Sequence, residues 1–333
     1  MVALVDAQAR AQDQITAGVV TLITHLLRGF SAWYDEREIA KVVVPIASQV
    51  LAGQEAAAHL TTAYLSQVLA AYNVATPVAS LAPDAGYLRD ADILEVYSRL
   101  FETYRWAVST GKSDAEASQL ALDRAELVAD TDVNLGMREA TRTGLQHITE
   151  VLGYRRVIHP ELSRGGTCGL CIAASDRIYA KAELLPIHGR CHCTTAPLLA
   201  GGEDPGKSLN ASDLARLYSD AAGGDNKQST TNGAALKRTR YQVDEHGELK
   251  AVLVPAKPYQ ARDGETKLPA QGSRAAKPAA TKDRLPTFGE QLDRLEKTLP
   301  PFQAMADAGN PQAMALVKQR MARIAELRQR LGR

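Results

Sequence analysis

All four cysteines of this 333-residue chain lie between positions 168 and 193, together with two of its seven histidines. They form two groups, Cys168-Gly-Leu-Cys171 and His188-Gly-Arg-Cys191-His192-Cys193. A Cys-x-x-Cys turn places two thiolates close enough to bind one tetrahedral ion, and a second group on the far arm of a loop can complete the ligand set. The spacing therefore predicts a loop whose two distant arms are joined by a zinc ion.

Five side chains are the candidate zinc ligands: Cys168, Cys171, His188, Cys191 and Cys193. Cys191 and Cys193 are two residues apart and would face the same side of an extended strand, so either could be the fourth ligand, with Cys193 slightly favoured. His192 would face the opposite side and is the weakest candidate. Four protein ligands rich in sulfur describe a closed structural zinc site, whereas catalytic zinc keeps an open position.

Other uses of the cysteines fit the pattern less well. Disulfides are not expected, because residues 1–14 lack the basic and apolar regions of a secretory signal. A redox dithiol would need the Cys-x-x-Cys pair to open a helix of a βαβ unit, whereas the preceding pattern is helical. Unligated buried thiols seldom gather at metal-binding spacings, but the sequence alone leaves that alternative open.

The expected fold class is mainly α. Over residues 1–153, apolar residues recur at spacings of three and four, and the aromatic content of only 5% also favours helices over sheets. The apolar stretch 17–33 contains His25 and Arg28, so we expect it in the core and expect no membrane contact.

Three further segments follow the helical domain. Residues 154–200 are expected to form the zinc-binding motif with short β elements. Residues 201–285 are rich in Gly, Pro, Ser, Thr, Asn, Asp and Lys and are expected to form a flexible linker with a β-hairpin at 240–254. Residues 286–333 are expected to form a helical basic tail, whose last helix begins at Pro311.

The tail concentrates positive charge, although the net charge of the whole chain is only +1. Its candidate contact residues are Lys318, Arg320, Arg323, Arg328 and Arg330. These cations could contact nucleic-acid phosphates or an acidic protein surface, or they could form a solvated helix face. An apolar stripe on the same helix indicates a partner, because a lone terminal helix cannot bury such a stripe.

The cysteine segment resembles the C-terminal motif of the MuF-like head-morphogenesis proteins of tailed bacteriophages. The matching residues are Gly165-Gly166-Thr167-Cys168-Gly-Leu-Cys171, then Pro186-Ile187-His188-Gly-Arg190-Cys191-His192-Cys193, then Pro197. The family usually has arginine at the position of His192, and often an acidic residue just before the first cysteine. The resemblance implies a minor capsid protein of the virion, present in the host cytoplasm during assembly, with portal, capsid or scaffold partners and possible contact with packaged DNA.

A capsid maturation protease is the alternative function. The sequence contains no Gly-x-Ser-x-Gly and no His-Glu-x-x-His motif, but a catalytic triad is a spatial arrangement that a sequence does not exclude. Asp130-Thr-Asp132 could bind a cation, and is more typical of a helix cap or a solvated face. We therefore expect a structural and assembly protein, with the protease as its rival.

Overall fold

The computed structural model describes residues 2–80, 86–159, 162, 174–181, 193–202, 204–211, 215, 241–246, 250–255 and 286–332. The described chain is mainly helical with a small antiparallel sheet, which confirms the expected fold class at that level. Its elements are α1 (Val2–Leu27), α2 (Glu36–Ala71), α3 (Ile93–Ser109), α4 (Asp114–Gln146), β1 (Val151–Val157), β2 (Ile178–Tyr179), β3 (Thr194–Leu199), β4 (Tyr241–His246), β5 (Lys250–Pro255), α8 (Phe288–Lys297), α9 (Leu299–Asp307) and α10 (Pro311–Arg330).

Side-chain caps fix where the long helices begin. Asp35 and Asp92 accept hydrogen bonds from backbone amides in the first turns of α2 and α3, and Ser113 forms a capping box with Glu116 at the start of α4. Pro45 lies inside α2 without ending it. The two apolar stripes of α2, around residues 39–51 and 60–72, belong to one continuous helix, because the alanine-rich stretch between them favours helix.

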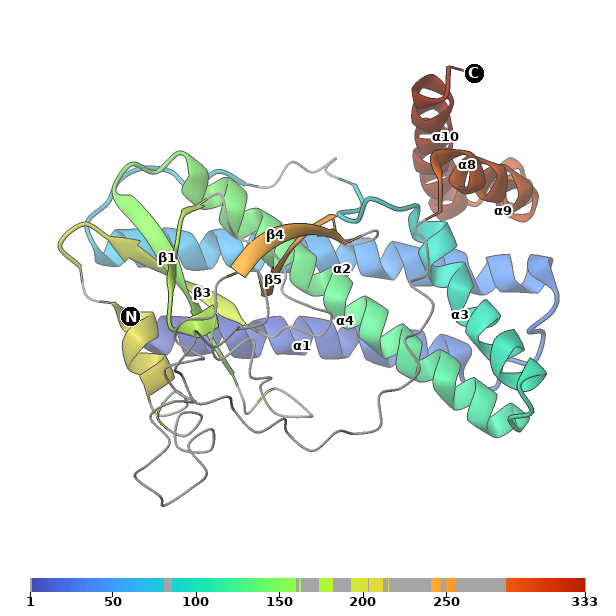
Figure 1. Ribbon diagram of the computed structural model, residues 1–333, viewed down its shortest axis with the longest axis horizontal. Coiled ribbons are helices and arrows are strands. Elements are labelled where there is room, and N and C mark those ends of the chain that lie inside the picture. The colour runs from blue at the N-terminus through green and yellow to red at the C-terminus, as the bar shows by residue number, and fades with distance from the viewer. Residues whose placement is uncertain are drawn as a thin grey trace, which may run out of the picture.

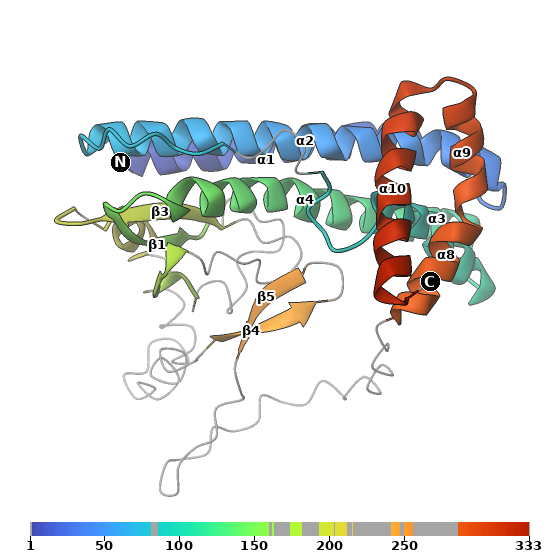
Figure 2. The ribbon, with the colours of Figure 1, turned by 90° about the horizontal axis from the view of Figure 1, so that it is seen from above.

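Helices α1 and α2 run side by side along the long axis of the molecule, α4 packs against both at an oblique angle, and α3 packs at one end (Figures 1 and 2). Glycines allow these helices to approach closely. A Cβ at Gly136 of α4 would lie 2.4 Å from the carbonyl oxygen of Gln54, and one at Gly53 would lie 2.7 Å from Cγ2 of Val19. The main core lies between these helices.

The sheet packs against the other end of the helices (Figure 1). Its strand order is β2-β1-β3, all antiparallel. A second core unites residues of α1, α2 and α4 with all three strands, and the Tyr64 hydroxyl of α2 donates to the Thr195 carbonyl of β3 at 2.8 Å. The sheet therefore shares its core with the helical part, and its first strand begins at Val151, slightly before the expected boundary at 154.

Three helices, α8 to α10, follow in residues 286–332 and are called here the C-terminal unit. In both views it lies across the end of the bundle that is far from the sheet (Figures 1 and 2). An antiparallel hairpin, β4–β5, is present where the sequence predicted one. Among the described residues, no helix combines the length and apolar character needed to cross a bilayer.

Candidate metal centre

The structure describes one of the five predicted zinc ligands. Cys193 lies immediately before β3, whereas Cys168, Cys171, His188 and Cys191 fall outside the described residues. Convergence of the five side chains on one ion is therefore untested. The described parts of the chain still show how the connection 158–193, which contains the predicted loop, is anchored.

Cys193 is 4% exposed and packs in the core that the sheet shares with the helices. Tyr179 of β2 lies in the same core, stacked against Tyr154 of β1 with ring centroids 5.4 Å apart. The Arg156 guanidinium lies over the Tyr179 ring at 5.3 Å. Burial raises the pKa of the Tyr179 phenol; Arg156 and Arg177 oppose this increase, and the neighbouring Cys193 adds to it. Cys193 is thus buried beside Tyr179, whose ring lies under the Arg156 guanidinium.

Pairing between β1 and β3 brings together the two ends of the connection 158–193, which contains the predicted zinc-binding loop. Val157, near the end of β1, lies opposite Thr194, the first residue of β3. Just beyond the paired residues, Nε2 of His159 lies 2.7 Å from Oγ1 of Thr194, and both residues are buried. The middle of the loop is also anchored, because the Tyr179 hydroxyl donates to the Ala174 carbonyl at 2.9 Å.

A short helical segment, residues 205–211, holds this end of the sheet in place. Asn210 is fully buried; its Oδ1 accepts from the Ile158 amide at 3.1 Å, and its Nδ2 donates to the carbonyls of Arg156 at 2.7 Å and Ser175 at 3.3 Å. Nearby, the Asp204 carboxylate pairs with the Arg155 guanidinium at 2.7 Å. The predicted linker boundary at 201 is therefore wrong, because residues as far as Asn210 are part of the sheet's packing. Sequence reasoning missed this because the Gly-rich and polar composition here is typical of linkers.

Replacing Asn210 with alanine should lower the free energy of unfolding by roughly 1 to 3 kcal/mol, because three buried backbone groups lose this partner. Urea denaturation followed by circular dichroism would measure the loss. The matched control is Ser208→Ala, an exposed change in the same segment that should have almost no effect. Equal losses for the two variants would contradict the structural role given to Asn210.

The predicted contact residue Arg320 has another role. Its side chain is fully buried, and its NH2 group lies 2.5 Å from Oδ1 of Asp92. It therefore cannot reach a phosphate at the surface, and the prediction of a surface contact at this position is wrong. The reason is that Asp92, more than 200 positions away in the sequence, supplies the counter-charge.

The other basic residues of the tail lie nearer the surface. Lys318 is exposed. The remaining three pair with carboxylates of this chain: Arg323 with Asp90 at 3.1 Å and Glu326 at 2.7 Å, Arg328 with Glu296 at 2.7 Å, and Arg330 with Glu326 at 2.5 Å. Part of their charge is thus neutralised within the molecule, and their contact with DNA or an acidic partner stays a prediction.

A buried polar network around Asp132 was not foreseen. The sequence favoured a cap or solvated face for this residue, yet it lies in the middle of α4 and is fully buried. Its carboxylate accepts from the hydroxyls of Tyr87 at 2.7 Å and Tyr97 at 2.8 Å, and it pairs with Arg89. Burial and the nearby carboxylate raise the pKa of both phenols well above the usual value, so they remain protonated donors.

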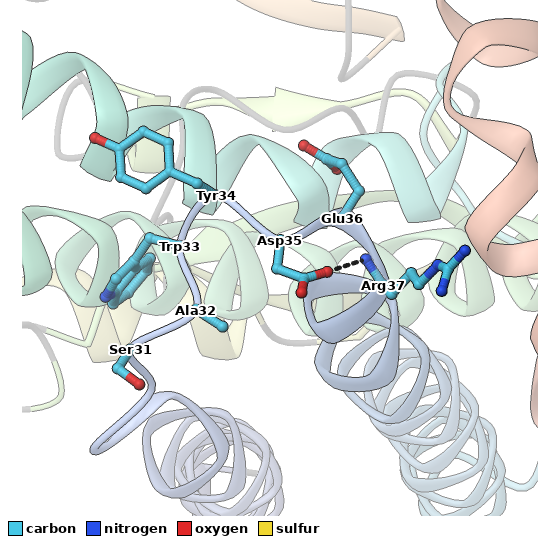
Figure 3. Close-up of a pocket in the computed structure, with 7 residues that line it drawn as sticks. All are labelled: Ser31, Ala32, Trp33, Tyr34, Asp35, Glu36 and Arg37. Carbon is cyan, nitrogen blue, oxygen red and sulfur yellow. Dashed lines mark hydrogen bonds between the residues drawn. The ribbon is translucent and has the colours of Figure 1, made fainter.

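A shallow hollow lies at the turn between α1 and α2, lined by residues 31–37 (Figure 3). The Asp35 carboxylate accepts from the Arg37 amide at 2.9 Å, and Trp33 stacks on Tyr104 with ring centroids 4.1 Å apart. The Asp35 side chain thus serves to cap α2. We interpret the hollow as the surface of a helix connection.

Within the described ranges, no three His, Cys, Asp or Glu side chains are grouped as a metal site would require. A scan against protein-family models, a search of curated proteins and a search of solved structures each returned no match.

Proposed function

We propose that this chain is a MuF-like minor capsid protein of a tailed bacteriophage, with a structural and assembly role near the portal and one structural zinc ion per chain. The observation that carries the proposal is the two-group spacing from Cys168 to Cys193. Zinc in such a site would contribute folding free energy to a loop that is too short for a core of its own.

The anchoring of the loop supports the binding of one zinc ion by ligands from both arms. Cys171 is three residues from Ala174, and Cys191 is two residues from Cys193, so the connecting chain spans at most roughly 11 Å and 7 Å. Ala174 and Cys193 belong to the same buried cluster. Both ligand groups therefore begin close to the same buried core, and the buried position of Cys193 suits a ligand shielded from water.

The proposal predicts one zinc ion per chain after purification without chelators. Elemental analysis should find about one zinc per chain in the unmodified protein and less than about 0.2 in the double variant Cys168→Ser with Cys171→Ser. Comparing Cys191→Ser with Cys193→Ser identifies the fourth ligand, since only one of the two should abolish binding. Undiminished zinc in the double variant would rule out the proposed ligand set.

The assembly role is tested separately from the metal. The protein should co-purify with portal or procapsid when the head proteins are expressed together, and incubation with capsid subunit should leave that subunit intact by mass spectrometry. The double cysteine variant should be depleted from particles. Cutting of the capsid subunit that stops on a single Ser, Cys or Asp substitution would replace the assembly role with the protease.

A further inference from the structure

The C-terminal unit has a small core of its own and a separate face turned toward the helical bundle. Its internal core consists of Leu292, Leu295, Ile324 and Leu327. Its docking side chains, which join the main core, are Phe302, Ala313, Leu316 and Val317. The predicted apolar stripe of the last helix is thus divided: Val317, Ile324 and Leu327 are buried by this chain itself, while Met314 and Met321 remain largely exposed.

Arg320 stands at the centre of the docking face. Beyond its pair with Asp92, its NH1 group donates to the carbonyl of Thr298 at 3.2 Å, and its guanidinium lies 4.8 Å from the centre of the Phe302 ring. Asp92 in turn caps α3 by accepting from the Glu95 amide at 2.8 Å. Arg320 of α10 thus contacts the junction of α8 and α9 within the C-terminal unit and pairs with Asp92 at the start of α3.

Further ion pairs surround Arg320, and in these too the positive charge belongs to the C-terminal unit and the negative charge to the helical bundle. Arg294 of α8 reaches Glu95 at 3.0 Å and Glu102 at 2.5 Å, and Arg323 of α10 reaches Asp90 at 3.1 Å. In each case the arginine belongs to the C-terminal unit and the carboxylate to residues 90–102. The docking surface therefore consists of a buried ion pair set among apolar side chains, with further ion pairs of complementary charge around them.

We propose that the C-terminal unit is a non-covalent clasp, bound to the helical bundle of its own chain through the Arg320–Asp92 pair and the apolar face around it. Its attachment depends on this surface and not on the peptide connection through residues 256–285. A chain cut within that connection therefore stays assembled. The clasp depends neither on the proposed zinc site nor on the phage role.

The test uses the full chain with a recognition sequence for a site-specific protease inserted between Asp263 and Gly264. After complete cutting, size-exclusion chromatography and native mass spectrometry at micromolar concentration should find the two pieces together in a 1:1 complex in 0.1 M NaCl. In 1 M NaCl the complex should weaken but persist, because the peripheral pairs are screened and the buried pair is not.

Variants locate the attachment. Arg320→Met should raise the Kd of the two pieces by about 100-fold or more, because it leaves Asp92 buried without its counter-charge. The matched control is Arg328→Met in the same helix, whose partner Glu296 lies inside the C-terminal unit; it should leave the Kd unchanged. Asp92→Asn removes the charge but keeps a side chain that can cap α3. A rise in Kd similar to that of Arg320→Met would therefore be due to loss of the ion pair and not to loss of the cap.

The Arg320→Met piece could bind more weakly because it does not fold. The variant Arg294→Met tests the same surface without altering a buried residue. That variant should raise the Kd only a few-fold and make it less sensitive to salt. Separation of the unmodified pieces at micromolar concentration in 0.1 M NaCl would overturn the inference. So would equal Kd values for Arg320→Met and Arg328→Met, or a cut complex containing two copies of each piece.

Discussion

Replacing Asp132 with alanine is expected to lower the free energy of unfolding by roughly 3 to 5 kcal/mol, the range observed when one partner of a buried ion pair is removed. The substitution leaves the Arg89 cation and the hydroxyls of Tyr87 and Tyr97 buried without the carboxylate that accepts from all three. The midpoint of thermal unfolding, followed by circular dichroism, should fall by on the order of 10 °C.

The control for this experiment lies in the same helix. Asp123 is exposed on α4, where its carboxylate accepts from the Gln119 side chain at 2.8 Å, so Asp123→Ala should change the stability by less than about 0.5 kcal/mol. Asp132→Asn should fall between the two, since the amide oxygen can still accept from a phenol but cannot neutralise Arg89. Similar midpoints for Asp132→Ala and Asp123→Ala would mean that the network contributes little to stability.

Gly136→Ala should also be strongly destabilising, although alanine is the better helix former. The added Cβ would lie 2.4 Å from the Gln54 carbonyl oxygen and 2.9 Å from its Cα, and these are backbone atoms that cannot move aside alone. Helices α2 and α4 must separate, and we expect a net loss of roughly 2 to 3 kcal/mol in urea denaturation.

Gly18→Ala in α1 is the matched control for this prediction. A Cβ at Gly18 meets no atom within 4 Å, so the same substitution should be neutral or should stabilise the protein by up to about 1 kcal/mol. If both variants shifted stability in the same direction by the same amount, close packing of α2 against α4 would not be the cause.

Much of the secondary structure followed from local pattern. The spacing of three and four among apolar residues predicted the helical N-terminal part, and Pro311 begins α10 as expected. The hairpin from Tyr241 to Pro255 was predicted from two β-prone runs around a turn. Such features depend on neighbours within a few residues, which is why a single sequence contains enough information to predict them.

The candidate site was predictable only in its chemistry. The Cys and His spacing indicates the ligand types, and the register of β1 with β3 was needed to bring together the two ends of the connection 158–193 that contains them. The role of Asn210 was not predictable from its surroundings in the sequence, because its three partners come from the end of β1, from the residue that follows it, and from Ser175.

The sequence by itself determined the helical character of the N-terminal part, the hairpin, the start of the last helix and which residues could bind a metal, because periodicity, turn residues and ligand spacing act over short stretches of chain. Only the tertiary structure decided which charges are buried. Asp132 and Arg320 look like ordinary surface residues in the sequence, and each became an internal anchor because a distant segment supplies its counter-charge. Burial of a charge is stable only with such a partner, and the partner's position depends on how the helices pack.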